Sequence, residues 1–371
     1  SSKINYDSYI KNLDDIKQYL NICNLEIERY KNNSVALVIP KIPSLLIFHK
    51  SKLQKDKIYM GIDKNLEDYY LNLNELTHFI TVAETGAGKS TFIQNFLLSI
   101  FYNHNQVDNF YLIDPKKAEF GRYKNLKKVV YADTEVKMIR TFQKLQKTMY
   151  KRFETMQSNT IDGGDVIYQG NYIFLAMDEF GTLGTISNKN IKKELETIII
   201  DIAQKARRAK IILIFIGQSA KTTSIPSTVI GNLSSRGIMK TKDPDNISKM
   251  VGNSEELKER SINPKEFNRG RLYFKNGFNG DNILLQSPFF DLSNKEHLEV
   301  LKNTVKDLII EEKTTQSFDI QIGNLWQRTK STNDKELSSL IRKEIQQLKR
   351  DLKSLSDDEI ELRIKEIEKL Y

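Results

Sequence analysis

The stretch Ala83-Glu-Thr-Gly-Ala-Gly-Lys-Ser90 decides the fold, because it lies between an apolar run of strand length and a helical pattern that begins at Lys89. A phosphate cradle needs backbone N–H groups that face inward, which glycines permit, and a helix N-terminus behind them. It also needs a lysine for the β- and γ-phosphates and a hydroxyl group for Mg²⁺. We therefore predict a nucleotide site with the binding residues Thr85, Gly86, Ala87, Gly88, Lys89, Ser90 and Thr91.

Working outward, apolar runs of strand length alternate with helical patterns from His78 to Gly217. Strands are expected at 78–83, 110–113, 172–177 and 211–216, and helices from 89, at 135–156 and at 191–208. Continuous apolar strands separated by helices are typical of a parallel sheet with helices on both faces. The predicted fold class is therefore α/β, and two further strands are expected at 237–240 and 271–274.

The two ends of the chain differ from this central region. Apolar spacing predicts a helix over Tyr9–Leu20, and strands are expected at 35–39 and 57–62. The C-terminal end predicts a charged helical hairpin, with apolar positions at Ile341, Ile345, Leu348, Leu352, Leu355, Ile360, Ile364, Ile367 and Tyr371. We therefore divide the chain into an N-terminal α/β lead-in at 1–74, a nucleotide-binding domain at 75–300 and a C-terminal helical region at 301–371. The hairpin is interpreted either as a partner-docking arm or as a helix pair folded back on the core.

Two carboxylates follow the predicted strand at 172–177, and they indicate hydrolysis. Asp178 at the strand tip can hold Mg²⁺ through water, and Glu179 can orient or deprotonate the attacking water. Gln218 follows the strand at 211–216, so it lies at the carboxyl edge of the sheet, where ligands bind. We predict that Gln218 contacts the γ-phosphate or the attacking water.

Composition indicates the cellular compartment of the chain but does not identify a binding partner. The 371 residues carry 57 − 48 = +9 formal charges, which suits a polyanionic partner but also arises from a lysine-rich composition. The single cysteine, Cys23, excludes an intramolecular disulfide and places the chain in a reducing compartment, the cytoplasm. The longest aliphatic runs are far shorter than the roughly 20 residues of a membrane-spanning helix. The chain opens Ser1-Ser2 without methionine, so the sequence leaves open whether a membrane anchor has been removed upstream of it.

Several segments together resemble one family of motor ATPases. The chain lacks both the Asn-Lys-x-Asp motif that reads guanine and the Leu-Ser-Gly-Gly-Gln signature of transporters. The four similar segments are His78–Ser90, Tyr111–Lys116 with Glu119, Ala203–Ala209 followed by Gln218, and Gly231–Arg236. They resemble the FtsK/SpoIIIE/HerA DNA-translocating ATPases, over a region from about Met60 to Phe274.

This resemblance implies a RecA-like core that binds ATP and Mg²⁺, with Ser90 and Asp178 at the metal and Lys89 and Glu179 in catalysis. It implies a ring, usually a hexamer, that hydrolyses ATP between subunits and moves double-stranded DNA. Such sites take an arginine from the neighbouring subunit, and we favour Arg207 over Arg236 for this role. Asp114 and Lys116 are expected near the nucleotide or a subunit contact.

A motor on DNA also needs cations that face the DNA phosphates. Candidates are lysines on loops that follow the acidic pair and Gln218, namely Lys189, Lys192, Lys193 and Lys221. Each of these is at least as well explained as a solvated surface lysine.

The C-terminal region does not resemble the winged helix of chromosome-segregating members. What remains resembles coupling proteins of Gram-positive conjugative elements, such as the TcpA group, at the cytoplasmic face of the membrane. That resemblance implies relaxosome and secretion-channel proteins as partners. A second interpretation is a type VII-like protein-secretion motor. Such motors typically contain several ATPase domains in tandem, whereas this chain has a single phosphate-loop motif. A third is a degenerate scaffold, suggested by Ala83 where glycine is usual, and intact Lys89, Ser90, Asp178 and Glu179 argue against it.

Overall fold

The computed structural model describes residues 6–20, 26–30, 34–38, 42–158, 167–221, 225–252, 254–259, 262–310, 322–327, 329, 335–351 and 357–368. The chain divides into two compact units, 1–308 and 309–371. The first unit is built on a ten-stranded sheet with the strand order β4-β3-β12-β11-β10-β5-β9-β8-β6-β7.

The six strands from β10 to β7 pair in parallel, which confirms the predicted parallel sheet. Their bounds are β5 Phe79–Val82, β6 Val107–Ile113, β7 Val129–Ala132, β8 Tyr172–Asp178, β9 Ile211–Gly217 and β10 Ser235–Ile238. Every residue of β8 and β9 is buried, because helices cover both faces of these central strands. Continuous burial explains why both strands read as unbroken apolar runs.

The other four strands extend this sheet in antiparallel fashion, which the sequence analysis did not predict. They are β3 Lys57–Ile62, β4 Asp68–Asn72, β11 Arg271–Lys275 and β12 Asn282–Gln286. The expected boundary at 74/75 therefore lies inside a segment that contributes to the main sheet. Two buried side chains of the first long helix hold β3 in place: Asn95 donates to the Tyr59 carbonyl at 2.7 Å, and the Ser99 hydroxyl accepts from the Tyr59 N–H at 3.3 Å.

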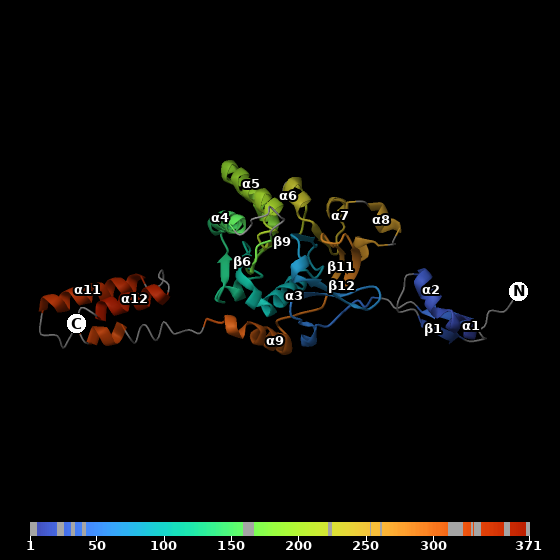
Figure 1. Ribbon diagram of the computed structural model, residues 1–371, viewed down its shortest axis with the longest axis horizontal. Coiled ribbons are helices and arrows are strands. Elements are labelled where there is room, and N and C mark those ends of the chain that lie inside the picture. The colour runs from blue at the N-terminus through green and yellow to red at the C-terminus, as the bar shows by residue number, and fades with distance from the viewer. Residues whose placement is uncertain are drawn as a thin grey trace. The chain divides into compact units, whose positions relative to one another are not determined.

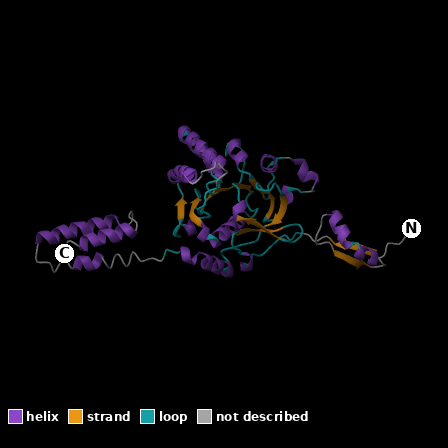
Figure 2. Ribbon diagram, viewed as in Figure 1, coloured by secondary structure: helices purple, strands orange, loops and turns teal. Residues whose placement is uncertain are grey.

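Helices cover the two faces of the sheet in two groups, as Figure 1 and Figure 2 show. The helices are α3 Lys89–Tyr102, α4 Glu135–Ser158, α5 Lys189–Lys205, α6 Ser227–Asn232, α7 Pro244–Val251, α8 Ser254–Glu259 and α9 Lys295–Val305. One face carries α3 and α9, and the other carries α4, α5, α6 and α7. Alternate residues of β8 enter the two cores, with Phe174 on the α3 side and Leu175 on the α4 side.

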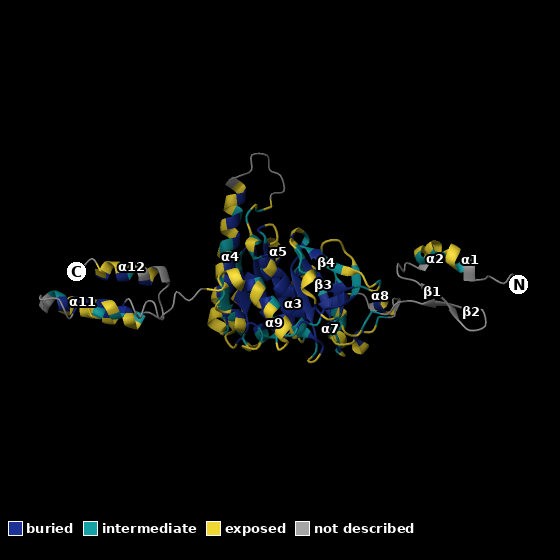
Figure 3. Cartoon of the chain, turned by 90° about the horizontal axis from the view of Figure 1, so that it is seen from below, coloured by how far each residue is buried: buried dark blue, intermediate teal, exposed yellow. Residues whose placement is uncertain are grey.

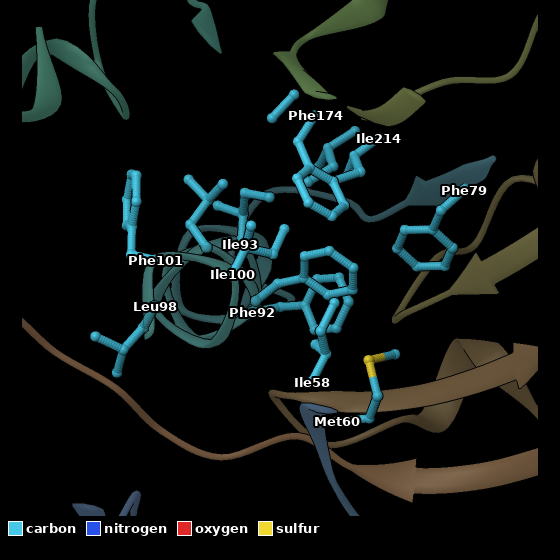
Figure 4. Packing of buried hydrophobic residues seen from close by; sticks show 14 of the residues in the cluster. Ile58, Met60, Phe79, Phe92, Ile93, Leu98, Ile100, Phe101, Phe174 and Ile214 are labelled. Carbon is cyan, nitrogen blue, oxygen red and sulfur yellow. The ribbon is translucent and has the colours of Figure 1, made fainter. Parts of the chain in front are cut away.

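Helix α3 is the most deeply buried helix of those named here, and it positions the phosphate cradle at its N-terminus. Residues Phe92 to Phe101 are all buried, because the helix lies between the sheet and α9. Figure 3 shows the dark blue interior around α3. In Figure 4, Phe92, Ile93 and Phe101 of α3 lie among core side chains from the strands, including Phe79, Phe174 and Ile214.

The remaining described segments form small elements at both ends. Helices α1 Tyr6–Lys11 and α2 Leu13–Leu20 precede the strands β1 Glu26–Tyr30 and β2 Ser34–Val38, which pair antiparallel. In the second unit, α11 Lys335–Asp351 and α12 Asp357–Glu368 bury the predicted positions Ile341, Ile345, Leu348, Ile360, Ile364 and Ile367. The other predicted positions of this hairpin, Leu352, Leu355 and Tyr371, lie outside the described residues, as does Cys23. No helix among the described residues is long and apolar enough to span a bilayer.

Candidate nucleotide site

The loop from Ala83 to Gly88 connects β5 to α3 and forms the cradle that its sequence predicts. Gly86 and Gly88 have φ angles of 81° and 101°, in the left-handed region that glycine adopts without strain. Gly88 is also the residue before α3 and offers no side chain to cap the helix. The first N–H groups of α3 are therefore free of a capping side chain, and they favour an anion.

Ala83 fits the position where glycine is usual. Its side chain is fully buried in the core on the α3 side, and its N–H donates to the Gly217 carbonyl at 3.0 Å. The next residue, Glu84, anchors the loop to the end of β10, because its carboxylate accepts from the Thr241 hydroxyl at 2.9 Å and from the Lys242 N–H. These hydrogen bonds lower the pKa of Glu84. Alanine therefore leaves the loop conformation intact.

Lys89 and Asp178 form an ion pair of 2.5 Å between Nζ and Oδ1. The pair joins the start of α3 to the end of β8, which are far apart in sequence. Asp178 is 1% exposed, and this burial raises its pKa although the Lys89 charge acts in the opposite direction. Ser90 is exposed beside this pair, and its hydroxyl contacts the Glu119 carboxylate. Hydroxyl and carboxylate oxygens are the ligands that Mg²⁺ prefers, so Ser90 and Asp178 fit the predicted metal role.

Glu179 has a strained backbone and a tightly held carboxylate. Its φ of 58° lies in the left-handed region, which is rare outside glycine and clusters at functional sites. Its Oε2 accepts from Lys116 Nζ at 2.8 Å and from Gln218 Nε2 at 3.0 Å. Glu179 is only 7% exposed, so two neighbouring strands orient a nearly buried carboxylate beside Asp178.

A turn after β6 supplies two further contacts, from Lys116, which was expected near the nucleotide or a subunit contact, and from Glu119, to which the sequence analysis gave no separate role. The fully buried Asp114 accepts from the N–H groups of Ala118, Glu119 and Phe120 at 3.1, 3.0 and 2.8 Å. This carboxylate fixes the turn, from which Lys116 reaches Glu179 and Glu119 reaches Ser90. The sequence signal for these contacts is the Asp-Pro-Lys-x-x-Glu motif that begins at Asp114. It follows β6, which is the parallel neighbour of β8, so both strands end at the same edge of the sheet.

Gln218 is held at the carboxyl end of β9. Its carbonyl accepts from Asn246 Nδ2 at 3.1 Å, and Asn246 Oδ1 accepts from the Ala220 N–H at 2.8 Å. The fixed backbone directs the Gln218 amide to Glu179. The structure thus brings together Lys89, Ser90, Asp178, Glu179 and Gln218 at one edge of the sheet.

Arg207 and Arg236 do not lie at this edge in the same chain. Arg207 follows α5 and precedes β9, so it lies at the amino edge, where it is exposed and packs over the Phe278 ring at 5.4 Å. Arg236 lies near the start of β10 and donates to the carbonyls of Lys249, Ile230 and Leu233 at 3.0, 3.3 and 3.4 Å. Burial lowers the pKa of Arg236. Its guanidinium therefore binds the ends of α6 and α7 within its own chain.

The candidate DNA-contacting lysines differ in their surroundings. Lys189 and Lys193 are exposed on α5. Lys192 donates to the Gly184 carbonyl at 3.1 Å, and Lys221 lies 3.6 Å from the Asp243 carboxylate. Lys189, Lys193 and Lys221 are thus exposed, whereas the ammonium group of Lys192 is held by a carbonyl of its own chain.

A comparison with protein families finds a match that covers much of the nucleotide site. The model of the FtsK/SpoIIIE family matches residues 49–186, which include the phosphate loop, the β6 turn and the acidic pair. Over these residues the chain is similar to the FtsK/SpoIIIE family.

FtsK/SpoIIIE relatives match by sequence over about half of the chain. DNA translocase FtsK of Staphylococcus epidermidis is 26% identical over 229 residues, which are 55% of this chain and 28% of that protein. DNA translocase FtsK of Helicobacter pylori is 27% identical over 225 residues, 54% of this chain and 26% of that protein. This chain therefore matches little more than a quarter of the length of these curated relatives.

The fold is also similar to those of two solved structures. The conjugation coupling protein TcpA of pCW3, solved with ATPγS, has a TM-score of 0.59 and 19% identity, over 81% of this chain and 86% of that chain. EssC from Geobacillus thermodenitrificans, containing its ATPases 2 and 3, has a TM-score of 0.55 and 19% identity, over 72% of this chain and 52% of that chain. At this identity the similarity concerns the fold.

Proposed function

We propose that this chain is an ATP-driven translocase of double-stranded DNA, and that it acts as a coupling protein in the transfer of a conjugative plasmid or integrative element. The observation that carries the ATPase part is the meeting of the phosphate loop, Asp178, Glu179 and Gln218 at one sheet edge. We place the protein at the cytoplasmic face of the membrane, with relaxosome and secretion-channel proteins as partners.

Hydrolysis follows from the roles that the side chains can take. The amide groups of the loop and the Lys89 ammonium bind the phosphates, so Lys89 exchanges Asp178 for the γ-phosphate when ATP binds. Ser90 and Asp178 would hold Mg²⁺, which would neutralise charge on the phosphates. Glu179 accepts the proton of the attacking water, while Lys116 and Gln218 orient its carboxylate.

The position of Arg207 supports a ring. Arg207 lies at the amino edge of the sheet, whereas the phosphate loop lies at the carboxyl edge of the same chain. One chain therefore does not bring this arginine to its own phosphates. In a head-to-tail ring, which we propose to be a hexamer, the amino edge of one subunit supplies Arg207 to the site of the next.

Two observations support DNA as the substrate. The curated relatives that match over 55% and 54% of this chain are DNA translocases. The TcpA chain is covered to 86%, so its fold is matched nearly from end to end. A protein-secretion motor is the second candidate, because the EssC fold is also similar. That EssC structure contains ATPases 2 and 3, whereas this chain has one phosphate loop.

Steady-state ATPase activity, measured at high protein concentration and low salt with and without double-stranded DNA, tests this proposal. We expect DNA to stimulate hydrolysis, and added salt to weaken the stimulation, because contacts with phosphates release counterions. The Lys89→Ala variant serves as the inactive control. Activity that is indifferent to DNA but rises with a secreted protein substrate would contradict the DNA assignment and favour the second candidate.

A further inference from the structure

Helix α4 carries cations that the nucleotide site does not use. Between Glu135 and Glu154 its sequence contains six lysines and arginines and no acidic residue. Two of the six are engaged within the subunit, because Lys137 and the buried Arg152 each form an ion pair of 2.8 Å with an aspartate. The four that remain are Arg140, Lys144, Lys147 and Lys151.

These four cations lie on one face of the helix, and we call them the α4 stripe. Their spacing of 4, 3 and 4 residues places them in line, because an α-helix makes one turn in about 3.6 residues. The stripe faces away from the sheet, since Phe142, Leu145 and Met149 of the same helix are buried in the core. All four side chains are exposed, and Figure 3 shows exposed residues recurring along α4. The stripe is therefore open to a partner.

The α4 stripe has no counter-ion in the part of the chain that the structure describes. None of its four side chains forms a hydrogen bond or an ion pair there. Acidic residues of the neighbouring helix α5 are engaged elsewhere: Gln143 Nε2 donates to Glu194 at 3.1 Å, and Lys205 pairs with Asp201 at 2.5 Å. Like charges four residues apart on a helix repel one another. The stripe therefore costs stability in the isolated subunit, and a bound polyanion would remove that cost.

The surroundings of the stripe fit a sugar–phosphate backbone better than unpaired bases or a membrane. Binding through bases needs a free aromatic ring, but the hydroxyl of Tyr150, the exposed ring of α4, donates to Asp201 at 2.8 Å on the α5 side. A helix that lies in a membrane interface needs an apolar face. Among the described residues of α4, the exposed aliphatic side chain is that of Val136, which precedes the stripe.

The length of the stripe also suits a DNA strand. Arg140 and Lys151 are 11 positions apart, which corresponds to a rise of about 16 Å along the helix. Over this length, one strand of a DNA duplex carries about five phosphates. Four cations in line therefore match a short run of phosphates on one strand.

We propose that the α4 stripe binds the phosphates of duplex DNA, independently of base sequence. This inference rests on the proposed function, because it takes DNA as the substrate, and it assigns a contact surface separate from the loop lysines considered above. The same helix contributes Tyr150 and Glu154 to the cavity that Arg207 lines at the amino edge. DNA on the stripe would thus contact a helix that reaches the proposed intersubunit residue.

Fluorescence anisotropy of a labelled duplex of about 20 base pairs, measured over a series of salt concentrations, tests this proposal. The stripe variant replaces all four cations by glutamine, which keeps the helix propensity high. We expect the slope of log K against log[salt] to become shallower by about 3 to 4, and the affinity at about 0.1 M salt to fall at least about 100-fold.

A matched control variant loses the same charge from other surfaces. It replaces four exposed lysines by glutamine, and we expect its slope to stay within about one of the parental slope. The four lysines are Lys55, Lys124, Lys265 and Lys295.

Two further measurements distinguish a binding role from a structural one. The stripe variant should bind MgATP as the parent does, because the stripe lies outside the nucleotide site. Its unfolding temperature should equal or exceed that of the parent, because the repulsion between like charges is gone. The double variant Lys144→Gln/Lys147→Gln should show about half of the change in salt slope, and it provides the test if the fourfold variant does not fold.

The outcomes separate this proposal from the proposed function. A stripe variant with the parental affinity and slope would overturn the stripe alone, and so would equal losses in the stripe and control variants. Unchanged DNA binding with lost binding to vesicles that contain phosphatidylglycerol would also overturn it, and would assign the stripe to a membrane. A parent that neither binds duplex DNA nor hydrolyses ATP faster in its presence would contradict the proposed function, and the stripe with it.

Discussion

The two edges of the parallel sheet carry different kinds of polar group. At the carboxyl edge, side chains from three neighbouring strands and from α3 contact one another: Lys89 pairs with Asp178, and Glu179 accepts from Lys116 and Gln218. At the amino edge, Arg207 is exposed and packs on the Phe278 ring. It also lines a cavity of about 1020 Å³ with Lys205, Arg208 and Lys210.

This difference shows what a single subunit can supply. The carboxyl edge contains the loop, the oxygens that we propose for the metal and the carboxylate that we propose as the base, all within one chain. The amino edge contains Arg207, which cannot contact a nucleotide bound at the phosphate loop of its own chain, because the two edges are opposite ends of the same strands. We therefore expect substitutions at the carboxyl edge to act within a subunit, and substitution of Arg207 to act on the neighbouring subunit.

The largest effect is expected for Arg207→Ala. An arginine that stabilises transition-state charge in such motors contributes about 10³-fold or more to turnover. We expect kcat to fall by roughly this factor, while MgATP still binds because the loop is intact. Steady-state kinetics and calorimetry measure the two quantities. Arg208→Ala removes the neighbouring charge and is the control. Full activity of Arg207→Ala would contradict the proposal that Arg207 of one subunit completes the site of its neighbour.

Glu179→Gln tests the carboxyl edge. The amide keeps the size of the side chain but cannot accept the proton of water, so kcat should fall by about 10²- to 10³-fold. Nucleotide affinity should stay close to that of the parent, because Lys89 and the loop still bind the phosphates. Single-turnover hydrolysis gives the rate. Turnover at the parental rate would show that another group accepts the proton.

Lys116→Met sharpens the description of the same edge. Loss of the 2.8 Å contact leaves Glu179 oriented by Gln218 alone, so we expect kcat to fall roughly tenfold with little change in KM. Lys117→Met removes the adjacent charge, which faces Asp133 at 3.6 Å instead, and should leave kcat unchanged. Lys116→Arg should restore part of the activity. A change in KM without a change in kcat would contradict the positioning role.

A smaller effect is expected at the amino edge, where His78 makes the stability of the fold depend on pH. It is fully buried at the start of β5, where its Nδ1 accepts from the Leu213 N–H at 3.1 Å. Burial lowers the pKa of His78 to about 4, with a contribution from the Arg207 charge. The unfolded chain protonates this histidine near its ordinary pKa, so the folded state loses stability as the pH falls through that range.

We expect the His78 contribution to decrease the free energy of unfolding by about 1 kcal/mol between pH 7 and pH 5.5. Urea unfolding at a series of pH values measures the slope. In His78→Asn, which keeps an acceptor for Leu213, the slope should be shallower by that amount. An unchanged slope would mean that His78 stays neutral in both states.

Most of the parallel half of the fold could be predicted from the sequence, although β7 was missed, whereas β4, β12 and the pairing of the antiparallel half could not. Strands β8 and β9 are buried along their whole length and read as unbroken apolar runs. Strand β4 is exposed at its first residue and only partly buried at three others, so its sequence lacks such a run. Strand β3 was predicted, but its partner β12 follows more than 200 residues later, and no local pattern reveals that pairing.

The same limit applies to the site. Lys89, Asp178 and Glu179 follow from local motifs, because each motif carries its own strand or helix context. The contacts of Lys116 and Glu119 depend on β6 lying beside β8, which is a property of the strand order. Arg236 matches a family segment, but only the fold shows its three carbonyl partners.

The most direct test of the shared site is a mixing experiment with two inactive variants, Arg207→Ala and Lys89→Ala, at high protein concentration with double-stranded DNA. In a mixed ring, a Lys89→Ala subunit keeps Arg207 and can supply it to the intact loop of an Arg207→Ala neighbour. We predict that the mixture hydrolyses ATP well above the sum of the two variants alone. A mixture that stays at that sum would contradict a site divided between the two edges of neighbouring subunits.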